Sequence, residues 1–348
     1  MTVRDALIKH FIRYRKMTPA DSVKLCYQSE FGGGHLIKDA AVAKRRIEDE
    51  RYGTQRDAGI PMTESVGDGI CRLNFASIPE ALSSETICRM FIQSAAAVHG
   101  NEARFERKLN EITSLISEKY APFTAFDYMK YIERYFADGA GAVHHSFQYN
   151  SAYHPAYRVI LQSYAPYIGL FTEIDRRLAA SVCAPFLIRI DGRCGSGKST
   201  LAKMLNEIYG CGTAHTDDFY IPYELRTEGC GSVDYGRLSR ELSLLPSHDA
   251  EYGVYSCSEG RITGTQKVAA TPFCILEGSF SMNSEIKLPC DLSVFLTIPP
   301  EVQLERISKR CPEKLDDFKE KWIPAEEEYF KNNSVPEKCD FIIDTSEE

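Results

Sequence analysis

The segment of the sequence with the clearest chemical signature combines glycines, a lysine and hydroxyl side chains. It fits the pattern G-x-x-x-x-G-K-S/T and continues with a threonine: Gly192, Arg193, Cys194, Gly195, Ser196, Gly197, Lys198, Ser199 and Thr200. Glycines allow successive backbone N–H groups to turn toward a phosphate chain, and the positive end of a following helix attracts the same charge. We therefore expect these residues to bind ATP, with Lys198 at the β- and γ-phosphates and the Ser199 hydroxyl on Mg²⁺.

The residues on either side of this segment have the patterns of a strand and a helix. Residues 186–190 form a short apolar run that leads directly into the glycines, and residues 201–205 have helical spacing. A glycine-rich turn that binds nothing is the alternative. The complete motif in a strand-to-helix context favours phosphate binding.

Two acidic positions follow behind the glycine-rich segment. Asp217 and Asp218 come after a predicted strand, where a carboxylate could accept a hydroxyl proton or ligate Mg²⁺. Glu277 ends a later apolar run and could hold a metal-bound water. The structural alternatives are a helix cap for the aspartates and a strand-end charge for Glu277. Their order behind the phosphate loop favours a site.

Two arginines, Arg306 and Arg310, lie on a predicted helix farther along the chain. Cationic side chains in such a place can close over a transferring phosphate and neutralise its developing charge. A solvated helix face is the alternative for these residues.

From about residue 183 to residue 345, the sequence resembles the uridine kinase and phosphoribulokinase group of P-loop kinases. The resemblance rests on GRCGSGKST, on the D-x-F-Y element at residues 217–220, and on ILEG, which contains Glu277. It implies a phosphotransferase that uses ATP and Mg²⁺ and has an alcohol group as acceptor. The implied reaction moves the γ-phosphate to a hydroxyl of a nucleoside-like metabolite.

The resemblance also implies roles for individual residues. Asp217 would be the general base on the acceptor hydroxyl, and Lys198, Arg306 and Arg310 would hold the charge of the transferring phosphate. Mg²⁺ would be supported by Ser199 and Glu277, and the acceptor would be bound by Asp234, Tyr220 and Tyr255. Residues 255–261 depart from the family pattern, because they lack the histidine with which uridine kinases read the pyrimidine edge.

Two alternative functions stay open at this stage. One is a kinase of the same superfamily that acts on a non-nucleoside, such as a vitamin precursor, a sugar phosphate or an amino acid. The other is a nucleotide-dependent switch or sensor whose N-terminal half binds an effector. No N-K-x-D or T-K-x-D guanine element is present, which argues against the GTPase form of a switch.

The two halves of the chain differ in the elements that they predict. After about residue 181, short apolar runs alternate with helical stretches, which is typical of a parallel sheet with helices on both faces. These runs lie at residues 186–190, 212–214, 272–276, 292–298 and 341–343. We predict an α/β P-loop NTPase domain over residues 182–348, preceded by a mostly α-helical domain over residues 1–181, with the boundary near Cys183. Helical patterns in the first half lie at residues 3–16, 19–31, 37–51, 84–99, 101–120 and 125–137.

An aromatic segment stands out in the first half. Residues 120–171 hold nine of the nineteen tyrosines, together with His144, His145, His154 and Arg158. These residues could form a pocket for an anionic or planar ligand. An aromatic core with interdomain packing is the favoured alternative. We expect the helical domain to supply oligomer contacts, regulation or part of the acceptor site.

Composition and charge narrow the possible partners. The chain has 348 residues and a net charge of −8, and residues 1–181 carry 23 Lys and Arg against 21 Asp and Glu. Neither half has the excess of positive charge that binding to a nucleic-acid polymer needs. The twelve cysteines show no metal-binding spacing, and no apolar run approaches the roughly 18 residues of a membrane span. We expect a cytoplasmic protein with a small-molecule acceptor, no membrane partner and the capacity to form a homo-oligomer.

Overall fold

The chain forms two compact units, Met1–Asp175 and Arg176–Glu348. The computed structural model describes residues 1–180, 184–226 and 232–346. The boundary expected near Cys183 therefore falls outside the described residues. Helix α8 (Ile168–Leu178) runs across the division between the units. In the part of the chain that is described, none of the helices is both long and apolar enough to span a membrane.

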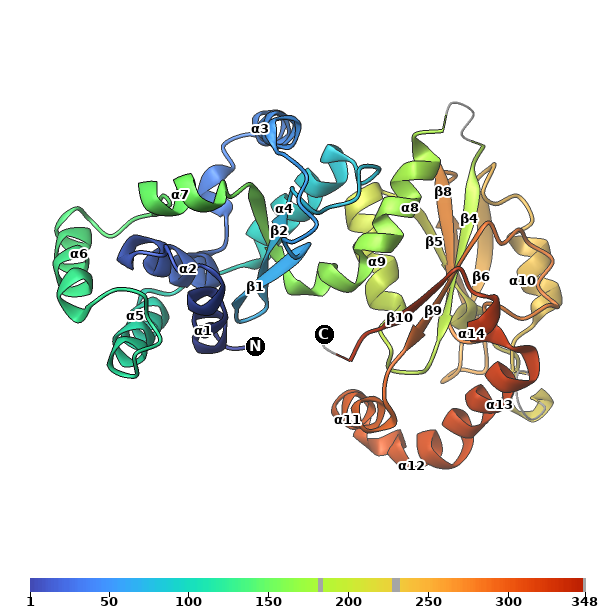
Figure 1. Ribbon diagram of the computed structural model, residues 1–348. Coiled ribbons are helices and arrows are strands. Elements are labelled where there is room, and N and C mark those ends of the chain that lie inside the picture. Colours follow the sequence, from blue (N-terminus) through green and yellow to red (C-terminus); the bar gives the residue numbers. More distant parts are fainter. Residues whose placement is uncertain (181–183, 227–231, 347–348) are drawn as a thin grey trace. The chain divides into compact units, whose positions relative to one another are not determined.

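The second unit is built on a parallel sheet of five strands in the order β10-β9-β4-β8-β5 (Figure 1). The predicted α/β fold is thereby confirmed. Strand β4 is buried along its whole length and pairs with both β8 and β9, so the segment that follows β4 lies at the middle of one sheet edge. The strands are β4 (Phe186–Gly192), β5 (Gly212–His215), β8 (Phe273–Glu277), β9 (Leu292–Thr297) and β10 (Phe341–Asp344).

Helices cover both faces of this sheet (Figure 1). Helix α9 lies on one face, and α10, α13 and α14 contribute Leu238, Tyr329, Phe330 and Val335 to the core on the other face. A two-stranded ribbon, which the sequence analysis did not predict, is formed by β6 (Ala250–Ser256) and β7 (Arg261–Val268). The helices are α9 (Lys198–Tyr209), α10 (Tyr235–Glu241), α11 (Pro300–Arg310), α12 (Leu315–Asp317), α13 (Ile323–Asn333) and α14 (Val335–Lys338).

The first unit is mostly helical, as predicted. Its helices start at residues that can satisfy free backbone N–H groups, such as the capping boxes formed by Thr2 with Asp5 and by Thr18 with Asp21. Leu7, Phe11 and Leu25 belong to one apolar core. The helices are α1 (Val3–Arg13), α2 (Pro19–Phe31), α3 (Ala40–Gly53), α4 (Ser84–Ala97), α5 (Glu102–Ser117), α6 (Ala125–Ala137) and α7 (Phe147–Tyr153).

The first unit also contains a small antiparallel sheet that the sequence analysis missed. Its strands are β1 (Thr63–Gly67), β2 (Ile70–Asn74) and β3 (Tyr157–Leu161), and β2 lies in the middle. Helices α1, α2 and α4 pack against these strands. Each strand is only five residues long, and the third comes from far along the chain, so local periodicity gave little signal.

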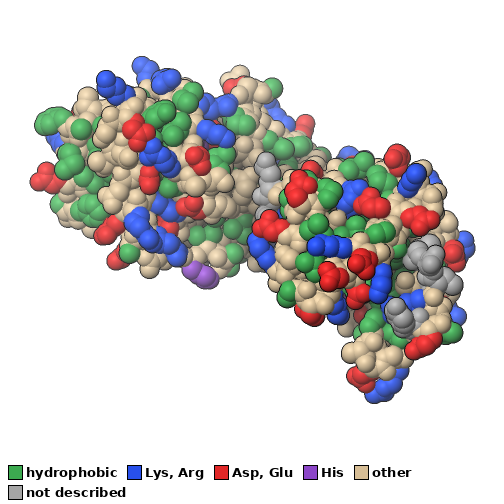
Figure 2. Space-filling model, turned by 90° about the horizontal axis from the view of Figure 1, so that it is seen from below, with side chains coloured by type: hydrophobic (Ala, Val, Ile, Leu, Met, Phe, Trp, Pro, Cys, Tyr) green, Lys and Arg blue, Asp and Glu red, His purple; other side chains and the backbone are tan. Residues whose placement is uncertain are grey.

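Charged side chains of both signs are interspersed on the surface of both units, on the face that Figure 2 displays.

Candidate functional site

The glycine-rich loop joins the central strand β4 to helix α9, and its glycines are required by its geometry. Gly195 and Gly197 have φ angles of 78° and 91°, a region that favours glycine. At Gly192, a Cβ atom would lie 2.2 Å from the carbonyl oxygen of Leu296 on β9. The loop therefore lies tightly against β9 and ends at the N-terminus of α9, where free backbone N–H groups can receive an anion.

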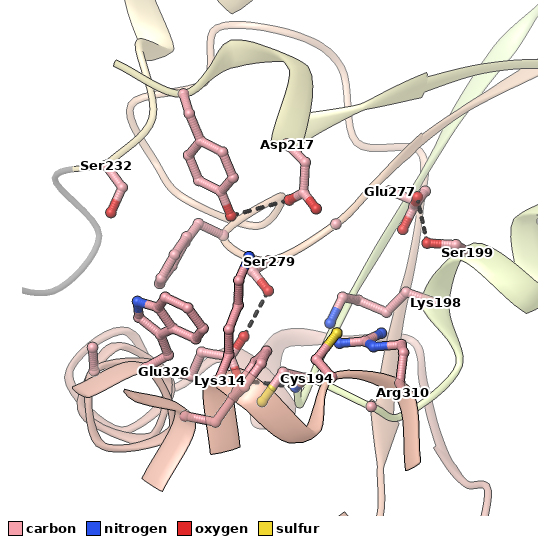
Figure 3. A pocket seen from close by; sticks show the side chains of 18 of the residues that line it. Cys194, Lys198, Ser199, Asp217, Ser232, Glu277, Ser279, Arg310, Lys314 and Glu326 are labelled. Carbon is pink, nitrogen blue, oxygen red and sulfur yellow. Dashed lines mark hydrogen bonds between the residues drawn. The ribbon is translucent and has the colours of Figure 1, made fainter. Parts of the chain in front are cut away.

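A cavity of about 470 Å³ lies beside this loop, within the size range of small-molecule sites. Figure 3 shows side chains from the loop, from the ends of β5 and β8, and from the α11–α13 region pointing into it. Ligands of open α/β sheets bind at this edge, outside the carboxyl ends of the strands. The predicted site residues that line the cavity are Cys194, Gly195, Gly197, Lys198, Ser199, Thr200, Asp217, Tyr220, Glu277 and Arg310.

Lys198 and Ser199 are both held at the loop end of the cavity. The Lys198 ammonium donates hydrogen bonds to the carbonyl oxygens of Gly192 at 2.7 Å and Arg193 at 3.1 Å. The Ser199 hydroxyl donates to Oε1 of Glu277 at 2.9 Å (Figure 3). A cation and a hydroxyl are therefore placed at the start of α9, next to the same cavity.

Glu277 is nearly fully buried at the end of β8, with 3% of its surface exposed. Its Oε1 also accepts a hydrogen bond from Nδ1 of His215 at 2.6 Å. This bond favours the charged imidazolium and raises the pKa of His215 above its ordinary value. The sequence analysis did not select His215, although it ends β5 and stands two residues before Asp217.

Asp217 and Asp218 differ in what they face. Asp217 lines the cavity and accepts a hydrogen bond from the Tyr220 hydroxyl at 3.1 Å. The walls of the site desolvate its carboxyl group and raise its pKa, while the Lys198 charge opposes this rise. Asp218 instead accepts a hydrogen bond at 2.8 Å from Tyr252, whose side chain is buried in the core.

The residues at the loop end of the cavity fit a magnesium site. The Ser199 hydroxyl and the Glu277 carboxylate supply oxygen atoms, which Mg²⁺ prefers. Proteins usually hold this ion with one or two carboxylates, and phosphate oxygens and water complete the octahedron. Within the described residues, no three His, Cys, Asp or Glu side chains form a metal-binding group by themselves. This arrangement suits an ion that arrives together with a phosphate chain.

The two predicted arginines of α11 have different surroundings. Arg310 lines the cavity, and its guanidinium lies 6.0 Å from the centre of the Phe318 ring. Arg306 donates hydrogen bonds at 3.3 Å to the carbonyl oxygen of Gly195 and to the Thr345 hydroxyl, so it ties the loop to the segment after β10. Both arginines line a neighbouring hollow of about 270 Å³ with Gly195, Gly197 and Thr200.

Helix α13 also holds the loop, a contact that the sequence analysis missed. The buried carboxylate of Glu326 accepts hydrogen bonds from the backbone N–H of Cys194 at 2.8 Å and from the Ser279 hydroxyl at 2.6 Å. The guanidinium of Arg193 pairs with Glu327 at 2.6 Å. In the sequence these acids belong to an ordinary charged helix, and only the fold brings them to the loop.

Two residues expected to bind the acceptor are not among the described residues that line the cavity. The Asp234 carboxylate caps α10 by accepting a hydrogen bond from the backbone N–H of Arg237 at 2.8 Å. Tyr255 lies on β6 and is half-buried. The cavity wall beyond Asp217 is instead made by residues that the sequence analysis did not select, namely Arg226, Ser232 and Cys257, next to Tyr220.

Comparisons with known proteins found similarity over part of the chain. No family model matches the chain. A dephospho-CoA kinase from Rhizobium meliloti (strain 1021) is 25% identical over 181 residues, which cover 46% of this chain and 89% of that protein.

Two solved structures illustrate the structural likeness. One is a possible uridine kinase from Bacillus stearothermophilus, which is 20% identical with a TM-score of 0.38 and covers 49% of this chain and 98% of its own. The other is D-glycerate 3-kinase from Cryptococcus neoformans, which is 16% identical with a TM-score of 0.33 and covers 43% of this chain and 82% of its own. Each of these two structures matches a little less than half of this chain.

Proposed function

We propose that the second unit is a kinase that uses ATP and Mg²⁺ to phosphorylate a hydroxyl group of a small metabolite. One observation carries this proposal. A complete phosphate-binding loop, on the central strand of a parallel sheet, shares one cavity with the Asp217 carboxylate, the Glu277–Ser199 pair and Arg310. A phosphate cradle alone would suit many nucleotide-binding proteins. A carboxylate with a raised pKa opposite that cradle is what a transfer reaction needs.

The residues of the loop would hold the nucleotide. The free N–H groups at the start of α9 and the Lys198 ammonium would receive the β- and γ-phosphates, and Lys198 would exchange its carbonyl partners for phosphate oxygens. Mg²⁺ bound at Ser199 and Glu277 would neutralise part of the phosphate charge. Arg310 would face the same phosphates from α11.

Asp217 would act on the acceptor. Its carboxylate would accept the proton of the acceptor hydroxyl while the hydroxyl oxygen attacks the γ-phosphorus and the bond to ADP breaks. The hydrogen bond from Tyr220 would hold the carboxylate in place. Its raised pKa makes Asp217 a stronger base than an ordinary aspartate.

A nucleoside-like acceptor is the first candidate, and a non-nucleoside with an anionic group is the second. The second is supported by the acceptor wall, where the Arg226 guanidinium lies 5.0 Å from the centre of the Tyr220 ring. A cation beside an aromatic ring suits a sugar phosphate or a hydroxy acid as well as a neutral sugar.

A phosphotransfer screen tests the proposal. The full chain, ATP and Mg²⁺ would be incubated with nucleosides, sugar phosphates and hydroxy acids, and mass spectrometry would detect phosphorylated products. We expect one class to be phosphorylated by the wild type and not by Asp217→Asn, with equal ATP affinity in calorimetry. Binding or slow hydrolysis of ATP without any phosphorylated acceptor would favour the switch or sensor instead.

A further inference from the structure

A second cavity lies within the first unit and plays no part in the proposed function. Its volume is about 850 Å³, within the range of small-molecule sites. The walls come from the end of α1, the segment after α3, strands β1 and β2, and the α7 region. Two of its lining residues, Arg72 and Tyr149, are almost completely buried and have unused hydrogen-bonding groups.

Arg72 is a buried cation that forms no ion pair with the described residues. Only 1% of its surface is exposed, and its guanidinium donates to the Gln28 amide oxygen at 3.0 Å and 2.9 Å. Among the described residues, no carboxylate oxygen lies within 4 Å of its nitrogens, and these two bonds use two of the five N–H groups of a guanidinium. Glu64, which lines the same cavity, attracts Arg72 without an ion-pair contact. The guanidinium therefore keeps N–H groups that can donate to an anion in the cavity.

Tyr149 supplies a second unsatisfied group in the same cavity. The residue is 2% exposed, and its hydroxyl makes no hydrogen bond with the part of the chain that the structure describes. The hydroxyl oxygen is open to the cavity rather than enclosed in the core. The hydroxyl can therefore receive or donate a hydrogen bond to a molecule in the cavity.

A chain of hydrogen bonds fixes the position of Arg72. Burial lowers the pKa of His145 to about 4, so its ring is neutral at pH 7, donates from Nδ1 to Asp21 at 2.8 Å and accepts at Nε2 from the Tyr157 hydroxyl at 2.6 Å. The Tyr157 oxygen accepts from the Gln28 amide nitrogen at 3.1 Å, which turns the amide oxygen of Gln28 toward Arg72. Such a connected network is typical of a preorganised site.

Aromatic rings line the cavity next to Arg72. The rings of Tyr14 and Tyr153 lie 4.9 Å apart, and Tyr149 lies 4.9 Å from Tyr153 and 5.4 Å from Tyr14. The Arg72 guanidinium itself lies 4.6 Å from the Tyr157 ring centre. Flat aromatic walls beside a buried guanidinium suit a ligand that has both a planar ring and a negative group.

We propose that this cavity binds a small planar molecule with an oxyanion, either a carboxylate or a phosphate monoester, which the Arg72 guanidinium and the Tyr149 hydroxyl receive. The three histidines and the arginine of the aromatic segment do not form one site. His154 lines this cavity, His145 belongs to the network behind it, and His144 and Arg158 line a different cavity. Arg158 is paired there with Glu50 at 2.9 Å.

Calorimetric titration of the full chain tests this site with two ring-bearing probes, phenyl phosphate and benzoate, and two ring-free probes, inorganic phosphate and acetate. We expect saturable binding of at least one ring-bearing probe, at least tenfold weaker binding to Arg72→Met, and about three- to tenfold weaker binding to Tyr149→Phe. Arg158→Met is the matched control, because it removes a buried arginine that is already paired. The stronger ring-bearing probe shows whether the oxyanion is a phosphate or a carboxylate.

The Lys198→Ala variant separates this site from the phosphate loop, because the new site should bind its probes equally well in that variant. Loss of binding in Lys198→Ala would assign the probes to the loop and overturn the proposal. The absence of saturable binding by both ring-bearing probes, or unchanged binding in Arg72→Met, would also overturn it. If Arg72→Met does not fold, an unchanged affinity in Tyr149→Phe would be decisive against it. None of these results depends on phosphotransfer by the second unit.

Discussion

Each unit contains a histidine that is hydrogen-bonded to a carboxylate, and the pKa values of the two histidines are shifted in opposite directions. His145 lies 2.8 Å from Asp21 in the first unit, and His215 lies 2.6 Å from Glu277 in the second. The side chain of His145 is 8% exposed, whereas that of His215 is 43% exposed. The pKa of His145 falls to about 4 because burial outweighs the bond to Asp21, and the pKa of His215 rises because the bond to Glu277 dominates.

The contact distance therefore does not decide the charge of a histidine beside an acid. The cost of removing the imidazolium from water decides it, and that cost depends on how much of the ring stays exposed. The first pair is a neutral element of a buried network. In the second pair the hydrogen bond favours the imidazolium form of His215, and Glu277 lines the cavity with the residues that we propose for phosphotransfer.

The largest expected effect is on the activity of the second unit. Asp217→Asn should lower kcat by about 10²- to 10⁴-fold because it removes the proposed base, while ATP affinity in calorimetry stays unchanged. Asp218→Asn is the matched control, because Asp218 faces the core through Tyr252 and should lower kcat far less. If steady-state kinetics gave the larger loss for Asp218→Asn, the proposed base would be assigned to the wrong aspartate.

A smaller loss of activity is expected when the His215–Glu277 pair is broken. Glu277→Gln keeps the shape of the side chain but removes the charge that holds Ser199, His215 and the proposed ion. We expect kcat/KM to fall by about 10- to 100-fold, with part of the loss restored at higher Mg²⁺ concentration. Asp21→Asn is the comparison variant in the first unit. An equal loss in Asp21→Asn would contradict the division of roles between the two pairs.

The buried pair should make the first unit sensitive to acid. A histidine with a lowered pKa contributes stability above its unfolded value of about 6.5, and this contribution is lost as the pH falls toward 4. Between pH 7 and pH 5 the loss should be about 2 kcal/mol. Amide hydrogen exchange in α2 at the two pH values measures it. His145→Gln, which does not titrate, should show a smaller change, and an identical change would refute the assignment.

Stability should depend on pH in the opposite direction, and more weakly, at the His215–Glu277 pair. A histidine with a raised pKa contributes stability below about pH 6.5 and loses this contribution as the pH rises through the raised value. An NMR titration should give His215 a midpoint above that of an ordinary histidine. The midpoint should move back toward the ordinary value in Glu277→Gln. A midpoint that does not move would mean that Glu277 is not the cause.

The sequence alone identified the parts of the site that depend on local motifs. The phosphate loop follows β4, Asp217 follows β5, and Glu277 ends β8 of the same parallel sheet. The alternation of strands and helices in the sequence predicted that they lie at one edge of that sheet. His215 and Glu326 were missed because their importance comes from partners far along the chain. The short sheet of the first unit was missed for a similar reason.

The cavity around Arg72 could not be predicted from the sequence for the same reason. Its guanidinium stands on β2, Gln28 on α2 and Tyr149 on α7, and no spacing in the sequence connects them. Asp234 and Tyr255 were selected from weak family matches, and the described structure uses Asp234 to cap α10. Several residues matched by the clear motifs line the cavity beside the glycine-rich loop, whereas Asp234 and Tyr255, matched weakly, are not among the described residues that line it.

The carboxylate of Glu326 has a consequence for how a nucleotide enters. One backbone N–H of the phosphate loop, that of Cys194, already holds a negative group that belongs to the protein. Nucleotide binding is then an exchange of one anion for another, and the measured affinity is the difference between two attractions. The incoming phosphate would displace the Glu326 side chain, so nucleotide binding to the loop would break a contact of α13. Replacing Glu326 with Gln should tighten ATP binding in calorimetry, and weaker binding would show that the carboxylate supports the loop instead of competing for it.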